Sequence, residues 1–575
     1  MAWEEVAQRK RTQREQCIHA FRRLINGAHK RRTTIAGKLV GHVEVPALTK
    51  MYATGEVSVE DVVVAVILQA IEAHEKTNCL TEPLFESAVE RARELDQYYR
   101  KTGKLVGPLH GIPMSLKDQF DIAGVDTTFG YVGRAFRPAS EDAPMTKVLK
   151  DLGAVIITKT NVPQTILWGE TENPMWGLTT LPDRPDFTAG GSSGGEAALL
   201  SLDGSLCGWG TDIGGSIRGP SHFNGLFGLK PTVESPATDK ARGSQSSRFS
   251  HRGVPGPHEG QEHVPSSVGP MAKRLSSLVA VTRAVLNSQA WLQDPKVVPM
   301  PWREAIYQEV LNRRLRIGLI VDDGIVEPHP PVQRAVREAA ALLRKAGHEI
   351  VPWDTSEHMS FIEIQVSLVV AVDKCRHAVA AGPHTQSQDQ FYRADGGEDI
   401  RREIAGAGEP MLPHVEALVA SSKPISVYDY WQLNRAKVRA QQTYNTKWDD
   451  AGVDVLLSPV AGHAALPHGC FRYTGYTKVW NFLDYTALSF PWTIVSKLLD
   501  SHDVNATSTT DRDRSAGLSN PFNAYNRRLY DLASMDGLPV GVQIIGRRFD
   551  EEKVLAVAEI LQSEADKSTQ KATGR

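Results

Sequence analysis

The sequence predicts an α/β protein, and two parts of the chain carry this prediction. Residues 113–117 and 154–159 are short, mostly apolar runs that favour strands, and a helical pattern separates them. The same order of strand, helix and strand returns at 316–322, 331–346 and 349–353. Because this alternation is typical of sheets covered by helices, we expect a β-sheet core between helical layers.

The expected helices have recognisable ends. Residues 58–75 are dense in valine, isoleucine and leucine, and Ser58 and Asp61 fit the N-cap and the first turn of a helix there. A glycine after the last turn takes the left-handed conformation that closes many helices. This signal ends three further helical patterns, at 86–102 before Gly103, at 145–151 before Gly153, and at 331–346 before Gly347.

Three polar stretches show neither helical nor alternating periodicity, and we expect surface loops at 239–261, 386–409 and 497–519. Loops on a rigid scaffold often carry binding residues. The first stretch is the best candidate for the mouth of a binding site, because it follows closely on the glycine-rich segment described below. The other two are expected either to cover a pocket or to decorate the surface.

Composition excludes several classes of function. The net charge is −2, so no global field favours nucleic acid or an anionic membrane. Residues 1–11 lack the apolar core of a secretory signal, and the apolar run 62–70 is shorter than the roughly 20 residues of a membrane span. The five cysteines form an odd count without close pairs, which favours reduced thiols. We therefore expect a cytoplasmic protein that acts on a small molecule, without a membrane span or a nucleic-acid partner.

The segment 190–218 indicates the chemistry. Gly-Gly-Ser-Ser-Gly-Gly-Glu begins at residue 190, and Ile-Gly-Gly-Ser-Ile-Arg ends at residue 218, so Ser192 and Ser216 lie in backbone with few side chains. Glycine allows left-handed turns and close approach of another group. Such turns can direct backbone amides at an anion, which is what an oxyanion hole requires.

With Lys117 at the end of Gly-Pro-Leu-His-Gly-Ile-Pro-Met-Ser-Leu-Lys, the chain strongly resembles the amidase signature family of Ser-Ser-Lys hydrolases. The resemblance continues through 223–231, 264–270 and 537–546. The residues at 48–60 and 168–174 resemble the fungal acetamidase and general amidase branch. The resemblance implies one large α/β/α domain with a mixed β-sheet core over 1–575. Its parts are a helical N-terminal segment at about 1–80, a signature core at about 107–231, and a C-terminal part at about 316–565 that completes the sheet.

The resemblance also implies the site residues and the absence of a cofactor. Lys117 matches the general base, Ser192 the bridging serine beside a cis peptide, and Ser216 the nucleophile. The backbone amides of the oxyanion hole match Ile213, Gly214, Gly215 and Ser216. The resemblance places Trp168, Asn173 and Met175 in a stretch near the substrate. Beside it, we expect Ser193 to support Ser192 and Lys117 by hydrogen bonding, and Thr211 and Asp212 to hold the nucleophile loop. Arg218 either pairs with Asp212 or is solvated. The partner is a small-molecule amide, and a homodimer stays open.

The proposed chemistry constrains Lys117. An amide is a poor electrophile, so hydrolysis needs an activated nucleophile, a stabilised oxyanion and a proton for the departing nitrogen. Lys117 can accept a proton only when it is neutral, and burial can lower the pKa of a lysine by up to roughly 3 to 5 units. The neighbouring Ile112, Met114 and Leu116 are consistent with burial. Asp118 should point to the opposite face of the strand and act structurally.

Other functions stay open at this stage. Gly191-Ser-Ser-Gly-Gly195 fits the G-x-S-x-G pattern, which would make Ser193 the nucleophile of an esterase-like α/β-hydrolase. A glutaminase subunit of an amidotransferase shares the triad, and a non-catalytic binding protein could share the scaffold. His258 and His263 are five residues apart rather than four, so we expect no metal there. Aliphatic, aryl, fatty and biosynthetic amides are all possible substrates.

Overall fold

The computed structural model describes residues 2–25, 41–233, 247–257, 260–261, 264–365, 392, 394–420, 422–500 and 521–573. One mixed sheet of 11 strands runs through them. Its first-half strands are β1 (Leu80–Pro83), β2 (Pro113–Lys117), β3 (Val155–Thr160), β8 (Cys207–Asp212), β9 (Phe227–Lys230) and β10 (Ser267–Ala272). Its second-half strands are β11 (Arg316–Leu319), β12 (Glu349–Pro352), β13 (Val455–Pro459), β14 (Ala487–Ile494) and β15 (Pro539–Ile545).

The strand order is β1-β3-β2-β8-β10-β9-β14-β15-β13-β11-β12. β2 lies parallel to β3 and β8, and β11 lies parallel to β12 and β13. Antiparallel strands lie between these two groups, and β9 pairs with β14 through Leu229 and Leu488. The two halves of the chain therefore share one sheet, which confirms the predicted α/β class with a mixed sheet. Two small sheets pair β4 (Glu172–Asn173) with β5 (Gly177–Leu178) and β6 (Thr180–Leu181) with β7 (Arg184–Thr188).

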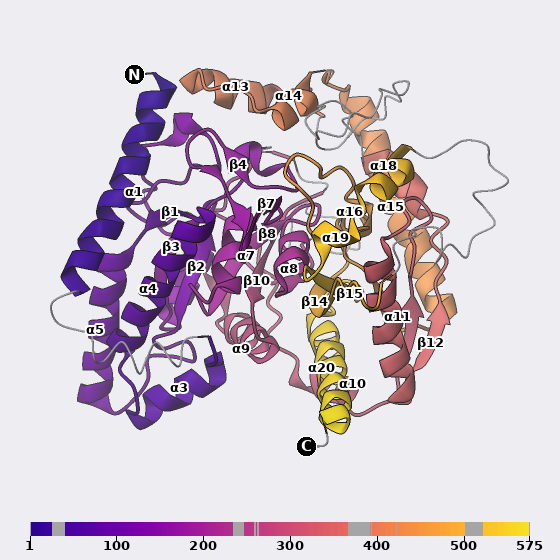
Figure 1. Cartoon of the computed structure of the whole chain (residues 1–575), viewed down its shortest axis with the longest axis horizontal. Coiled ribbons are helices and arrows are strands. Elements are labelled where there is room, and N and C mark those ends of the chain that lie inside the picture. The colour runs from indigo at the N-terminus through magenta and orange to yellow at the C-terminus, as the bar shows by residue number, and fades with distance from the viewer. Residues whose placement is uncertain are drawn as a thin grey trace.

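Helices from both halves of the chain cover the sheet. Those of the first half are α1 (Trp3–Ile25), α3 (Val45–Thr54), α4 (Val59–Thr77), α5 (Phe85–Thr102), α6 (Pro144–Asp151), α7 (Gly194–Ser201), α8 (Arg218–Asn224) and α9 (Leu275–Leu286). Those of the second half are α10 (Glu304–Leu311), α11 (Pro330–Lys345), α12 (His358–Gln365), α13 (Glu398–Ala407), α14 (Pro413–Val419), α15 (Val427–Ala451), α16 (Gly475–Phe482), α18 (Pro521–Leu529), α19 (Leu532–Met535) and α20 (Glu551–Thr573). Short 3-10 turns occupy η1 (Val132–Arg134), η2 (Gln164–Ile166) and η3 (Ala290–Leu292). Figure 1 shows α1 and α5 at one side of the molecule and α11 and α15 at the other.

The predicted start of one helix and the predicted end of another are confirmed. The Ser58 side chain accepts from the Asp61 amide and begins α4, and Gly103 closes α5 with a φ of 65°. The strand expected at 316–322 is shorter and ends at Leu319. Its end has a local cause, because the Asp323 carboxylate accepts from the Ile325 and Val326 amides and turns the chain.

The cysteine prediction needs one correction. Cys17, Cys79 and Cys207 are free, but Cys470 is disulfide-bonded. Neither the odd count nor the spacing of the cysteines in the sequence signals this bond. In the described part of the chain, no helix is long and apolar enough to cross a membrane.

Candidate active site

The end of β2 holds a buried lysine beside a serine. Lys117 is fully buried, and its Nζ lies 2.7 Å from Ser192 Oγ and 2.8 Å from Thr211 Oγ1. Burial lowers the pKa of Lys117 to about 7, although the carboxylates of Asp212 and Glu196 act in the opposite direction. An appreciable fraction of this amine is therefore neutral at neutral pH.

Parallel pairing brings the partners of Lys117 together. Leu116 of β2 is paired with Trp209 of β8, so the ends of both strands meet at one edge. Thr211 in β8 donates its hydroxyl proton to Gln119 Oε1 at 2.6 Å, and Gln119 Nε2 donates to the Pro255 carbonyl at 2.8 Å. Each side chain in this chain of hydrogen bonds is thereby oriented by the next.

The first glycine-rich turn places the two adjacent serines differently. The Gly191–Ser192 peptide is cis, and the Ser193 amide donates to the Ser216 carbonyl at 3.2 Å. Ser193 is fully buried, and its hydroxyl has no hydrogen-bond partner among the described residues. The role of Ser193 in this geometry is carried by its backbone.

The same arrangement bears on the elbow hypothesis for Ser193. β7 ends at Thr188, so a strand does precede the serines, but it belongs to a two-stranded sheet outside the main one. An elbow nucleophile must expose its hydroxyl at the top of the main sheet. Ser193 Oγ is buried instead, so the geometry disfavours an esterase that uses this serine.

The second glycine-rich turn follows β8 and ends at Ser216. Gly215 has a φ of 128°, which favours glycine, and Ser216 is 9% exposed. The Asp212 carboxylate accepts from the Gly215 amide at 2.8 Å and from the Ile217 amide at 3.2 Å. Asp212 also pairs with Arg218 through Nη2 at 3.0 Å. These contacts fix the conformation of the turn that carries Ser216.

Asp212 stays ionised in this buried position. Burial opposes its charge, but the Arg218 guanidinium and hydrogen bonds from Arg218 and Asn481 outweigh that cost and hold the pKa of Asp212 well below its usual range. The expected pairing of Asp212 with Arg218 is present. Asn481 belongs to α16, so a second-half helix is bonded to the turn that carries Ser216.

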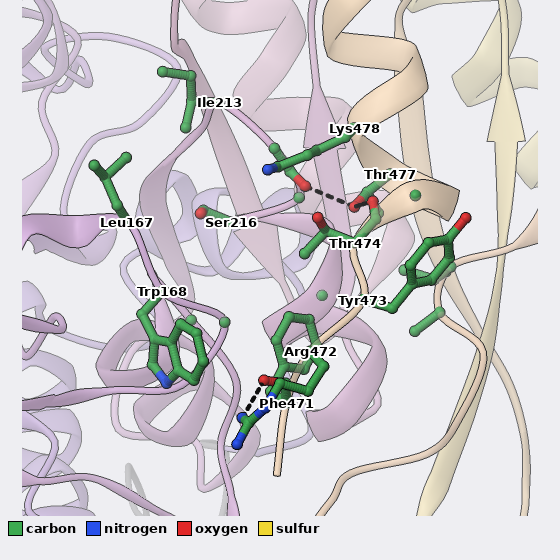
Figure 2. Close-up of a pocket in the computed structure, with 18 of the residues that line it drawn as sticks. Leu167, Trp168, Ile213, Ser216, Phe471, Arg472, Tyr473, Thr474, Thr477 and Lys478 are labelled. Carbon is green, nitrogen blue, oxygen red and sulfur yellow. Dashed lines mark hydrogen bonds between the residues drawn. The ribbon is translucent and has the colours of Figure 1, made fainter. Parts of the chain in front are cut away.

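Ser216 opens into a cavity of about 160 Å³ that Ile213, Gly214 and Gly215 also line. Figure 2 shows Ser216 on one wall of this cavity, with Trp168 and Phe471 contributed by separate segments. The Trp168 and Phe471 ring centroids are 6.5 Å apart. The cavity lining is largely apolar and includes Leu167, Trp168, Phe223, Ile325, Phe471 and Phe522.

The residues expected to contact substrate separate into two groups. Trp168 lines the cavity, where its ring stacks on His414 with centroids 5.0 Å apart. Asn173 is outside the cavity lining, and its amide group donates to Asn161 Oδ1 at 2.8 Å and accepts from the Trp176 amide at 2.7 Å. Met175 is fully buried in a cluster with Ala7, Val132 and Trp176.

Sequence reasoning missed the segment 471–478, which contributes seven lining residues: Phe471, Arg472, Tyr473, Thr474, Gly475, Thr477 and Lys478. The available signal was the aromatic density of Phe-Arg-Tyr-Thr-Gly-Tyr-Thr-Lys.

The expected loop 386–409 is wrong in part, because α13 (Glu398–Ala407) forms a helix there that Gly408 closes in the left-handed conformation. Tyr392 from the same stretch lines the cavity, whereas the described residues of 239–261 do not. Residues 386–391 and 393 lie outside the described residues. Residues 239–246 and 501–519, as well as His258 and His263, lie outside the described residues.

A buried lysine that contacts one serine, with a second serine facing an apolar cavity, is the arrangement of a serine hydrolase with a lysine base. Comparison with known proteins gives the family. The family model for amidases matches residues 61–555. The chain therefore belongs to the amidase family and is an amide hydrolase.

Individual relatives match almost end to end. "Amidase 1" of Gibberella moniliformis is 49% identical over 91% of this chain and 93% of its own length. An acetamidase of Emericella nidulans is 36% identical over 89% of this chain and 87% of its own length. The solved structure of a fatty acid amide hydrolase is 30% identical, has a TM-score of 0.80, and matches 92% of this chain and 86% of that protein.

Proposed function

We propose that this protein hydrolyses a linear carboxylic amide to a carboxylic acid and ammonia or an amine, through an acyl-enzyme on Ser216. The observation that carries the proposal is the contact of Lys117 Nζ with Ser192 Oγ at 2.7 Å, made by an amine whose pKa is lowered to about 7. A lysine in this state can accept a proton at neutral pH. The residue after Ser192 is bonded to the turn that carries the second serine, because the Ser193 amide donates to the Ser216 carbonyl at 3.2 Å.

The proposed acylation moves two protons and forms one bond. Ser192 gives its proton to Lys117 Nζ and takes the proton of Ser216, whose oxygen bonds to the amide carbon. When the carbon–nitrogen bond breaks, the protons return in the opposite direction, from Lys117 to Ser192 and from Ser192 to the leaving nitrogen. Water then gives a proton to Lys117 through Ser192 and attacks the ester carbon. When the ester bond breaks, Ser216 leaves with a proton that returns through Ser192.

The proposed oxyanion hole uses the turn 213–216. The Gly215 amide already donates to Asp212 at 2.8 Å, so we assign the larger share of the oxyanion to the amides of Ile213, Gly214 and Ser216. Asp212 and Arg218 hold this turn, and Thr211 orients Lys117. Trp168 is the one predicted substrate residue that we retain as a substrate contact.

The test combines a fluorophosphonate probe, which labels activated serines, with a panel of simple amides and four alanine variants. Ser216→Ala should lose both labelling and turnover. Lys117→Ala and Ser192→Ala should lower kcat/KM by about a hundredfold to ten-thousandfold, the usual contribution of a positioned base. Ser193→Ala should retain most of the activity, because its hydroxyl contacts neither Lys117 nor the cavity.

The opposite pattern, with Ser193→Ala inactive and Ser216→Ala active, would replace the proposed nucleophile. The protein should act on amides as a lone chain. If glutamine were hydrolysed only after a partner protein was added, the protein would instead be a glutaminase subunit.

We also propose a cytoplasmic location, with a homodimer left open. The three free thiols support a reducing compartment, and the disulfide at Cys470 is the one feature against it. Cell fractionation tests the location, and light scattering of the purified protein tests the oligomeric state.

A further inference from the structure

Phe471 forms an aromatic wall of the cavity that Ser216 also lines (Figure 2). Its ring centroid lies 6.5 Å from that of Trp168, 6.3 Å from that of Phe223 and 5.7 Å from that of His463, each time edge to face. The place of such a wall decides how large an apolar group the cavity accepts. The position of the Phe471 ring therefore bears on which amides bind.

The Phe471 ring packs directly on the main chain of Gly169, which belongs to the first half of the chain. A methyl group on Gly169 would overlap the ring atoms of Phe471. Because no side chain separates the two residues, the backbone stops the ring on this side. On the other side, the position of the ring depends on how the backbone of residues 469–471 is held.

A single buried carboxylate holds that backbone. Glu170 is 3% exposed, and its two oxygens accept from the Gly469 amide at 2.8 Å and from the Phe471 amide at 3.0 Å. Nδ1 of His468 lies 3.9 Å from the carboxylate, which is beyond hydrogen-bond distance. Hydrogen bonds to an ionised carboxylate are about twice as strong as those between neutral groups. Glu170 does not line the cavity, so its side chain affects a substrate through Phe471 rather than by contact.

The main chain beside Glu170 also packs on the turn that carries Ser192. A methyl group on Gly191 would lie 2.7 Å from the Glu170 nitrogen and 2.5 Å from the Trp168 carbonyl oxygen. The main chain at 168–170 thus contacts the turn of Ser192, whereas the Glu170 side chain contacts the loop of Phe471. A side-chain substitution that preserves the backbone therefore acts on the cavity wall.

We propose that Glu170 is a positioning residue for substrate specificity, whose carboxylate fixes Phe471 as the wall that binds the apolar group of the amide. This inference rests on the proposed function of Ser216. Loss of the carboxylate should weaken the binding of amides with a large apolar group, which need the wall. Acetamide carries only a methyl group, so its hydrolysis should depend on the wall much less.

The test compares each variant with the wild type on acetamide, on phenylacetamide, whose ring is on the acyl side, and on acetanilide, whose ring is on the amine side. Glu170→Gln keeps the length of the side chain, but it places an NH₂ group against one of two backbone N–H donors. For at least one aromatic amide it should lower kcat/KM by about tenfold or more, mainly through a higher KM, as a misfit in an apolar pocket does. The change for acetamide should be much smaller.

Three further variants test whether Glu170 acts through Phe471. Phe471→Ala should lower the same rates, and Glu170→Gln added to it should cause little further loss, because the two residues form one unit. Gly169→Ala displaces the ring from the other side and should reproduce the effect with the carboxylate intact. Glu172→Gln makes the same substitution at an exposed carboxylate two residues away and should leave every rate unchanged.

Fluorophosphonate labelling of Ser216 separates the failure of this inference from the failure of the proposed function. An equal loss of labelling and of all three rates in Glu170→Gln would assign Glu170 to the turn of Ser192 and overturn the inference. Fully additive losses with Phe471→Ala, or a wild type that hydrolyses acetamide alone, would overturn it as well.

Glu170→Ala removes the carboxylate without adding an opposing donor, and it should show the same selective loss with labelling intact. If neither variant of Glu170 were labelled, Glu170 would be needed for folding and the inference would be wrong. A wild type that neither labels nor hydrolyses any of the three amides would refute the proposed function itself.

Discussion

At the scale of single residues, the hydrogen bonds around Lys117 determine which way its lone pair points. Thr211 gives its proton to Gln119, so its oxygen can only accept from Lys117. A neutral amine that donates to Thr211 can turn its lone pair toward Ser192, which then donates. The order of donors from Ser192 to Gln119 therefore suits Lys117 for the removal of a proton from Ser192.

The lowered pKa of Lys117 predicts the pH dependence of the reaction. Lys117 is protonated below its pKa of about 7 and cannot act as a base, and it is neutral above that pH. Activity should therefore reach a plateau above about pH 7. As the pH drops below this value, activity should fall by about tenfold for each further pH unit. The measurement is kcat/KM of a neutral anilide, whose own charge does not change over this range.

Lys117→Met is the control for this profile, because it keeps the length of the side chain and removes the titrating group. Its residual activity should show no break near pH 7. A wild-type rate that is constant from about pH 5 to about pH 9 would mean that Lys117 is not the base whose protonation limits the free enzyme.

Sequence reasoning could propose Lys117, Ser192 and Ser216 as candidates because each lies in a short glycine-rich or apolar motif that can be read locally. It did not identify Lys478, whose neighbour Thr477 is bonded to Gly214 from 263 residues away. No local pattern indicates such a contact, since it depends on how two segments meet in the folded sheet. Asn173 illustrates the reverse case, because its nearness in sequence to Trp168 does not bring it to the cavity.

At the scale of elements, α7 is packed so tightly at its N-terminus that its glycines are required for space. A methyl group on Gly195 would lie 2.4 Å from the backbone nitrogen of Asn161 and 2.6 Å from the carbonyl oxygen of the same residue. These backbone atoms cannot move aside easily, because the Gly195 amide donates to the Asn161 carbonyl and the Asn161 amide donates to the Cys79 carbonyl. The turn with Ser192 is thereby fixed to the edge of the sheet.

We therefore expect Gly195→Ala to lower the free energy of unfolding by about 1 to 3 kcal/mol, the usual cost of overpacking. Gly406→Ala in α13 is the matched control, because a methyl group there meets nothing within 4 Å. In a helix that change should be neutral or stabilise by up to about 1 kcal/mol. Denaturant unfolding measures both variants, and equal stabilities would show that the contact at Gly195 relaxes without cost.

The elements themselves were partly predictable. Strands β2 and β3 and helices α4, α5, α6 and α11 were expected within a few residues, because each has a clear apolar pattern or a glycine at its end. The sheet order was not predictable from those patterns, since β10, β9, β14 and β15 connect the halves through antiparallel pairs between remote segments. The segment 471–478 forms a cavity wall only because the strands are arranged in that order, so the sequence did not predict its place.

At the scale of the whole molecule, the cavity depends on both halves of the chain. Ser216 comes from the first half, whereas Phe471 and Lys478 come from the second. The halves are joined by the pairing of Leu229 with Leu488 and by the bond from Asn481 to Asp212. Separation of the halves would therefore remove one wall of the site and one support of the turn that carries Ser216.

We propose from this shared sheet that the described core unfolds as one unit, as expected for a single domain. Hydrogen exchange measured by mass spectrometry in increasing denaturant should then show that peptides covering β8 and β13 lose protection together. Fluorophosphonate labelling should be lost over the same range, because the site needs both halves. If β13 lost protection at a clearly lower denaturant concentration than β8 while labelling persisted, the halves would be separate folding units, and the cavity wall from the second half would be dispensable for activating Ser216.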